Sequence, residues 1–227
     1  MSWVKFKNEK SSNLKLTVTS IGRRQRAEEQ IDEYEIPYRN DNLIIHNNVY
    51  KPYIRQMEFA FKDKSKLPLI YTWLTGRGKL RTSNDTGGYF IASIVNAINT
   101  QKLSRLFDSC SVNFKVNPFF YLDSGDEALN IQAATTIINP GTFYSDPYIK
   151  ISGTGNVDLC INSRVYSFVG IDRYIEIDSD LKIVYKDTLN QGSKMTGDFP
   201  ILEVGENAIA WTGNVTNIEI IPKWREL

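Results

Sequence analysis

The feature that most constrains the fold is the regular alternation of short apolar runs with turn residues from Asn139 to the C-terminus. Apolar residues occupy every second position within each run, which is typical of half-buried β-strands. Clusters of glycine, asparagine, aspartate and proline separate the runs, so hairpin turns are expected between about eight antiparallel strands. This pattern predicts a β-sandwich. The expected strands are 148–151, 157–161, 165–169, 174–177, 181–185, 201–204, 208–211 and 217–221, with turns that include 153–156 and 212–214.

The first half of the chain predicts further strands and one helix. The segment 53–61 alternates apolar and polar residues, and Arg55 is the charged exception on its apolar face. A helix is expected within 66–74, where apolar residues recur on one side (Leu67, Ile70, Tyr71 and Leu74). The segment 23–34 is highly charged and carries no apolar stripe, so it predicts an extended arm or an edge strand.

A change in composition at 124–127 predicts the joint between two domains, 1–125 and 126–227. Both domains are expected to be mainly β, with the helix in the first. A chain of 227 residues is long enough to give each of them a hydrophobic core.

The charge balance and the cysteines limit the classes of function and the cellular compartments that are expected for this chain. Lysine and arginine total 27 against 26 aspartates and glutamates, which argues against a dedicated binder of nucleic acid or anionic membranes and suits a self-associating subunit. Cys110 and Cys160 are expected to be buried free thiols in a reducing compartment. The N-terminus lacks a signal pattern and no apolar run approaches membrane-spanning length, so folding in the cytoplasm is expected.

The sequence predicts no catalytic residue, no metal site and no cofactor. His46 is the only histidine, and it is expected to be an exposed turn residue because nothing near it resembles a nucleophile elbow. No cysteine and histidine spacing fits zinc. Four carboxylates cluster in the sequence at Asp172, Glu176, Asp178 and Asp180, and two of them could serve a cell-wall glycosidase or bind calcium. The alternation of Glu176 and Asp178 with isoleucines favours instead the polar face of a strand.

Two basic clusters are candidate contact residues. They could be solvated loops, or they could line a channel that passes nucleic acid or contact an acidic partner. These candidates are Arg23, Arg24, Arg26, Arg77, Lys79 and Arg81. Tyr148 and Trp211 are candidate saccharide contacts because aromatic faces suit pyranose rings, although the alternation of Trp211 with Ile209 favours core packing. A carbohydrate-binding module that recognises host cell-wall saccharides is therefore the alternative function.

Several short motifs occur in a fixed order in the second half of the chain. They are Asn139-Pro140-Gly141-Thr142, Ser145-Asp146-Pro147, 149–155, 177–179, 195–200, Gly205-Glu206-Asn207 and Trp211-Thr212-Gly213. Upstream of them are a strand ending at Phe61, the helix within 66–74 and a strand end at Pro118-Phe119. This ordered set resembles the siphophage distal tail proteins over nearly the whole chain, and the second half is the more specific part.

The resemblance implies a structural virion protein at the tail tip of a non-contractile phage or prophage of Gram-positive hosts. Members form a hexameric ring through an N-terminal β-sandwich domain with one helix, and they carry a galectin-like C-terminal β-sandwich domain. The implied partners are copies of the chain itself, the major tail tube protein, a tail-associated lysin or fibre protein, and a receptor-binding or baseplate protein. Phage DNA is implied to pass through the ring without specific binding. The chain is too short to contain the inserted carbohydrate-binding module of some members.

Overall fold

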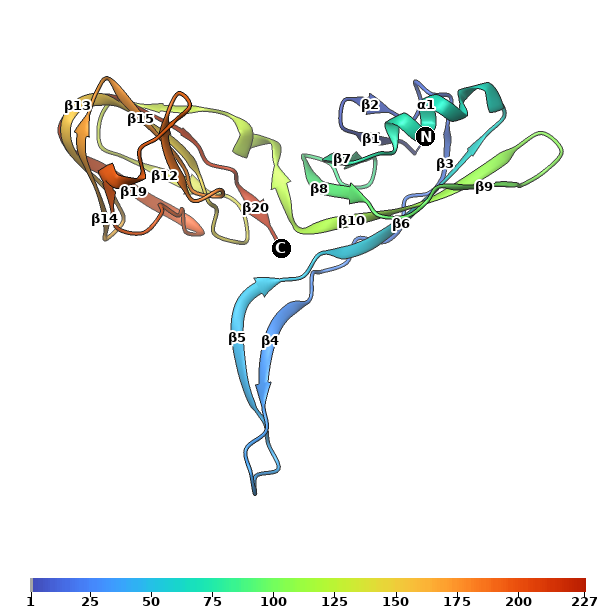
Figure 1. Ribbon diagram of the computed structural model, residues 1–227, viewed down its shortest axis with the longest axis horizontal. Helices are drawn as coiled ribbons and strands as arrows, with labels where there is room; N and C mark the ends of the chain where they lie inside the picture. The colour runs from blue at the N-terminus through green and yellow to red at the C-terminus, as the bar shows by residue number, and fades with distance from the viewer. Residues whose placement is uncertain (1) are drawn as a thin grey trace. The chain divides into compact units, whose positions relative to one another are not determined.

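The structure is a computed structural model that describes residues 2–227, and these residues are mainly β, as the sequence predicts. The chain divides into two compact units, one ending at Phe120 and the other comprising Tyr121–Glu226. Each unit contains one large curled sheet (Figure 1). The division into independently folding domains 1–125 and 126–227 stays a prediction.

The first unit is built on one sheet and a separate hairpin. The strands of the sheet are β1 (Val4–Phe6), β2 (Glu9–Lys10), β3 (Thr17–Ser20), β6 (Tyr53–Phe61), β7 (Arg77–Thr82), β8 (Gly88–Ile94), β9 (Asn99–Lys102) and β10 (Asp108–Leu122). Their order is β2-β1-β7-β8-β10-β6-β3, and β9 pairs with β10 beside this path. The hairpin consists of β4 (Glu29–Tyr34) and β5 (Leu43–Tyr50), which pair only with each other among the described residues.

The α-helix of the first unit is α1 (Leu67–Trp73), and the 3-10 turn η1 (Lys64–Lys66) precedes it. The predicted helix is confirmed, but its buried side differs from the expected one. Ile70, Trp73 and Leu74 are buried, whereas Tyr71 is 39% exposed. Trp73 decides this orientation, because its indole N–H donates a hydrogen bond to the backbone carbonyl of Phe6 and so draws the large ring into the core.

Arg55, the charged exception on the apolar face of β6, is buried among hydrophobic residues and only 2% exposed. Its Nη1 donates to Oδ2 of Asp85 at 2.7 Å, and its Nε donates to the carbonyl of Ile21 at 3.0 Å. The hydroxyl of Thr82 donates to the same Asp85 oxygen at 2.7 Å. The loop between β7 and β8 therefore supplies the carboxylate that makes a buried arginine tolerable in this core.

The second unit is built around two long strands, β13 (Tyr148–Ile161) and β19 (Gly205–Ile221), of 14 and 17 residues. Its other strands are β11 (Leu129–Ile131), β12 (Thr135–Asn139), β14 (Arg164–Ile171), β15 (Tyr174–Asp178), β16 (Ile183–Lys186), β17 (Leu189–Asn190), β18 (Met195–Thr196) and β20 (Arg225–Glu226). The main path is β11-β19-β13-β15-β16-β17, while β12 pairs with β19 and β14 pairs with β13. The 3-10 turns η2 (Asp123–Asp126) and η3 (Gly192–Lys194) complete the unit.

The turns expected at 153–156 and 212–214 are wrong. β13 and β19 run through them as continuous partners, and the register shifts between Ser152 and Gly153 and again between Thr154 and Val157. The two backbones approach so closely that a Cβ atom at Gly153 would lie 2.3 Å from the carbonyl oxygen of Asn214. The glycines therefore permit bulges in two paired strands, and bulges bend strands where turns would have ended them.

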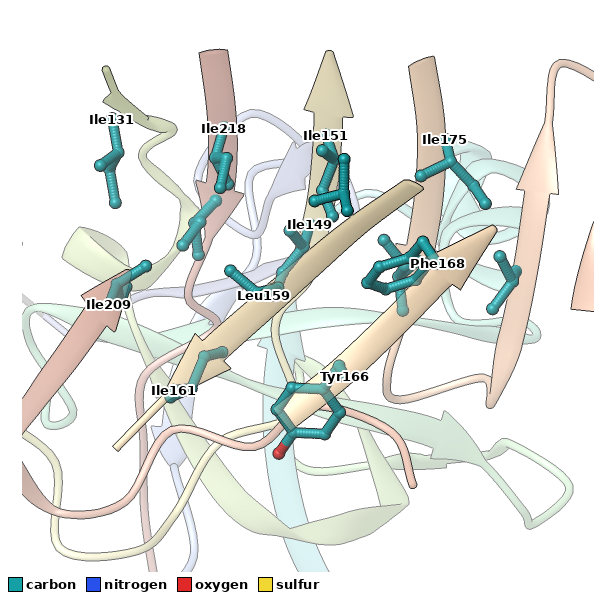
Figure 2. Packing of buried hydrophobic residues seen from close by; sticks show 14 of the residues in the cluster. Ile131, Ile149, Ile151, Leu159, Ile161, Tyr166, Phe168, Ile175, Ile209 and Ile218 are labelled. Atoms are coloured by element: carbon teal, nitrogen blue, oxygen red, sulfur yellow. The ribbon is translucent and has the colours of Figure 1, made fainter. Parts of the chain in front are cut away.

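Because both strands continue through these bulges, each contributes core residues from both of its halves. In Figure 2, Ile149 and Ile151 from the start of β13 and Leu159 and Ile161 from its end point toward the same interior. Tyr166 and Phe168 of the neighbouring strand β14 lie beside these aliphatic side chains in the same cluster. The buried members of this cluster are Ile131, Ile149, Ile151, Val157, Leu159, Ile161, Tyr166, Phe168, Ile171, Ile175, Ile177, Val184, Leu202, Ile209, Ile218, Ile220 and Trp224.

The substitution Gly213→Ala is expected to destabilise the second unit strongly. Gly213 has a φ of +98°, and a Cβ atom there would lie 2.3 Å from the carbonyl oxygen of Asn156. We expect a loss of about 2–4 kcal/mol in the free energy of unfolding, measured by denaturant titration. Gly155→Ala is the matched control, because φ is +81° but nothing lies within 4 Å of the added atom. Equal losses in the two variants would contradict the close-approach explanation.

The two cysteines differ in burial. Cys110 is 2% exposed, but Cys160 is only partly buried, so the expectation of two buried thiols is wrong for Cys160. Burial raises the pKa of Cys110 to about 11, so the thiol stays protonated at pH 8. In a Cys160→Ser variant, a thiol-reactive chromophore is expected to label Cys110 only after unfolding. Rapid stoichiometric labelling in native buffer would contradict the burial of this thiol.

Candidate assembly surface

The hairpin β4–β5 extends away from the sheet of the first unit (Figure 1). The extended, charged arm expected in this part of the sequence is confirmed for β4. Cross-strand partners include Ile31 with His46, Asp32 with Ile45 and Glu33 with Ile44. Because direct partners point to the same face, Ile44 lies on one face and Ile45 lies on the other.

Both faces of the hairpin expose apolar side chains to solvent. Ile31 and Ile44 on one face are 44% and 49% exposed, and Ile45 on the other face is 43% exposed. A two-stranded hairpin is marginally stable in water without a surface to pack on. Exposed apolar patches commonly mark interaction sites. The hairpin is therefore the best candidate for a contact with another protein chain. Its exposed large apolar residues are Ile31, Tyr34, Tyr38, Leu43, Ile44, Ile45 and Val49.

Polar contacts between the strands hold the register of the hairpin. His46 lies within β5, not in the turn expected after a strand, and its Nδ1 is 3.0 Å from Oε2 of Glu29. This hydrogen bond lowers the pKa of the Glu29 carboxyl. The Nδ2 of Asn47 donates to Oδ2 of Asp32 at 2.9 Å, which adds a second tie across the strands. His46 therefore has a structural role in the arm, and no nucleophile lies beside it in these contacts.

The hairpin is also acidic. Six carboxylates lie between residues 28 and 41, against the single arginine Arg39 in the same stretch. At neutral pH the arm therefore carries a clear negative charge next to its apolar side chains. The acidic residues are Glu28, Glu29, Asp32, Glu33, Glu35 and Asp41.

The structure places Arg24 of the first basic cluster and Lys79 and Arg81 of the second on different faces of the first sheet. The guanidinium of Arg24 lies 5.4 Å from the ring centre of Phe90, which belongs to the core face. Lys79 and Arg81 instead lie 3.9 and 5.0 Å from the ring centre of Tyr89. Since Tyr89 and Phe90 are neighbours on β8, they point to opposite faces. One subunit therefore does not bring the six candidates (Arg23, Arg24, Arg26, Arg77, Lys79 and Arg81) into one lining.

The saccharide candidates also lie apart. Tyr148 lies on the face of β13 that points away from the core, where its hydroxyl donates to Oε1 of Glu176 at 2.6 Å. Burial, together with this carboxylate, raises the pKa of Tyr148. Trp211 pairs with Leu159 and packs against the core. Tyr148 and Trp211 therefore form no common stacking platform.

The carboxylates Glu176 and Asp178 lie on the polar face of β15, as their alternation predicts. Asp178 is within 3.0 Å of Nζ of Lys223, and Glu176 accepts the hydrogen bond from Tyr148. Within residues 2–227, histidine, cysteine, aspartate and glutamate side chains form no group of three that could hold a metal ion. The helices in the described part of the chain are all too short or too polar to cross a membrane.

Comparison with known proteins gives a structural match but no sequence match. No family model and no curated protein matches this sequence. The crystal structure of the SPP1 Dit (gp 19.1) protein aligns with a TM-score of 0.72, covering 97% of this chain and 98% of that chain at 11% sequence identity. The chain has the Dit fold. SPP1 Dit is described as a paradigm of the hub adsorption apparatus in phages that infect Gram-positive bacteria.

The Dit fold confirms, at the level of the fold, the resemblance to siphophage distal tail proteins. The alignment spans almost the full length of both chains, so it includes both units. The apolar character of the arm was missed in the sequence, although Leu43-Ile44-Ile45 directly after the turn residues Asn40-Asp41-Asn42 was a visible signal. The structure adds this arm to the candidate contact residues of the chain.

Proposed function

We propose that this protein is a structural hub of the tail tip of a non-contractile phage or prophage. The observation that carries the proposal is the Dit fold, which extends over 97% of the chain. The exposed apolar side chains of the hairpin β4–β5 support a role in assembly, because such a surface suits a contact with another protein chain. The role is non-enzymatic and does not require a cofactor.

The subunits assemble into a closed ring of about six copies, because one heterologous contact repeated around an axis closes when the rotation permits. The hairpin β4–β5 supplies that contact from the first unit. The near-neutral net charge of +1 allows close packing of identical subunits without large overall repulsion. The second unit is a galectin-like domain that offers surface for attached proteins.

In the virion, the ring joins the major tail tube protein to a tail-associated lysin or fibre protein and to receptor-binding or baseplate proteins. Phage DNA passes through the centre without specific binding, which suits a chain that has no overall positive charge. The protein is made in the bacterial host and ends in the tail tip.

Size-exclusion chromatography with light scattering tests the ring. The expected mass is about six times the 26.0 kDa subunit at the higher protein concentrations. A mass of one subunit at every concentration, also after mixing with the tail tube protein of the same phage, would contradict the proposal.

A further inference from the structure

The edge of the first sheet carries a row of cations. Lys5 of β1 is the direct cross-strand partner of Lys10 on β2 and of Arg81 on β7. Like charges directly opposite each other destabilise a sheet. Lys79 lies on the same face as Arg81, two residues earlier on β7. We define Lys5, Lys10, Lys79 and Arg81 as the basic row.

The basic row lies on the face of these strands that points away from the core. The intervening residues Val4, Phe6 and Leu80 are fully buried on the opposite face. The members of the row are partly or fully exposed. Ile91, the partner of Lys79 on β8, is partly exposed on the same face. The surface therefore combines concentrated positive charge with some apolar area.

We propose that the acidic hairpin β4–β5 of one copy docks on the basic row of the next copy. This inference rests on the proposed ring and names the two surfaces that meet in it. The hairpin has complementary charge in Asp32, Glu33 and their acidic neighbours, and it has exposed isoleucines for the apolar part of the surface. Most of the hairpin side chains are exposed within their own chain, so they are accessible to a second copy.

The charges and the apolar residues act differently in this contact. Exposed ion pairs each contribute only about 0–1 kcal/mol, and salt weakens them. Buried apolar area supplies most of the affinity, while opposite charges fix the register and exclude wrong partners. A head-to-tail contact between two different surfaces of the same chain can close into a ring.

Charge reversal tests the docking. We expect Lys5→Glu/Lys10→Glu to weaken assembly about 100-fold or more in light scattering, and Asp32→Lys/Glu33→Lys to do the same. An equimolar mixture of these two variants is expected to regain the wild-type mass, because each reversed surface then meets its complement on the other chain. The matched control is Lys102→Glu/Arg105→Glu, which makes the same charge change at exposed positions near β9 and should assemble normally.

Three results would overturn the docking. One is a Lys5→Glu/Lys10→Glu variant that assembles like the wild type. Another is a mixture that stays monomeric although both variants melt like the wild type. If either charge-reversal variant fails to fold, the milder neutral variant Lys5→Gln/Lys10→Gln is tested instead. The third is that a fluorescent single-stranded oligonucleotide binds through Lys5 and Lys10 while charge reversal of these residues leaves assembly unaffected. That result would show that the basic row binds nucleic acid. A wild-type chain that is monomeric throughout would instead overturn the proposed ring itself.

Discussion

Removal of the hairpin is expected to convert the oligomer into a folded monomer. Replacing 29–50 by a Gly-Gly linker deletes all seven exposed apolar side chains of the arm. The backbone N–H of Lys51 donates to the carbonyl of Glu28 at 2.8 Å, so the cut ends already lie close together and a short linker can close them. The mass in light scattering should fall to that of one subunit, while the melting temperature changes by only about a few degrees.

The control for this deletion keeps the hairpin and changes only its apolar character. The substitution Ile44→Ser/Ile45→Ser removes one apolar side chain from each face and leaves the acidic residues in place. It should give partial dissociation, with a dissociation constant between those of the wild type and the deletion. If the deletion variant still forms an oligomer with the same number of subunits as the wild type, the hairpin is not part of the assembly contact.

The substitution Arg55→Met is expected to have the largest effect on stability in the first unit. It leaves the carboxylate of Asp85, which is 8% exposed, without its buried cation. Breaking a buried ion pair by removal of one partner typically costs about 3–5 kcal/mol. The free energy of unfolding, obtained from denaturant titration at neutral pH, should fall by about that amount.

The double variant Arg55→Met/Asp85→Asn separates the charge effect from lost packing. The neutral amide keeps a hydrogen-bond acceptor for the hydroxyl of Thr82 but removes the unpaired charge. It should therefore be more stable than Arg55→Met alone. A loss of less than about 1 kcal/mol in the single variant would show that Asp85 is solvated or protonated without penalty, contrary to this description of the core.

The sequence predicted the mainly β class and the position of the helix, because alternation and helical spacing are local signals. It did not distinguish bulges from turns at 153–156 and 212–214. Glycine and asparagine favour both structures, since each needs backbone that departs from a regular strand. The choice depends on the pairing of β13 with β19, whose partners are more than 40 residues apart in the chain.

The candidate contact surface was predictable only in part. The charge of the segment 23–34 indicated an arm, but apolar residues such as Ile44 usually indicate a core face, and only the structure shows both faces of the hairpin exposed. The basic candidate residues are alike in charge, but the structure does not bring them together on one face. Arg24 contacts the core-facing Phe90, whereas Lys79 lies on the other face over Tyr89.

Electron microscopy of the purified protein tests the central claim most directly. Class averages are expected to show closed rings of about six subunits around an open centre, because a repeated heterologous contact that closes leaves a passage along its axis. Isolated subunits at all concentrations, or open-ended filaments of indefinite length, would contradict a ring-forming hub.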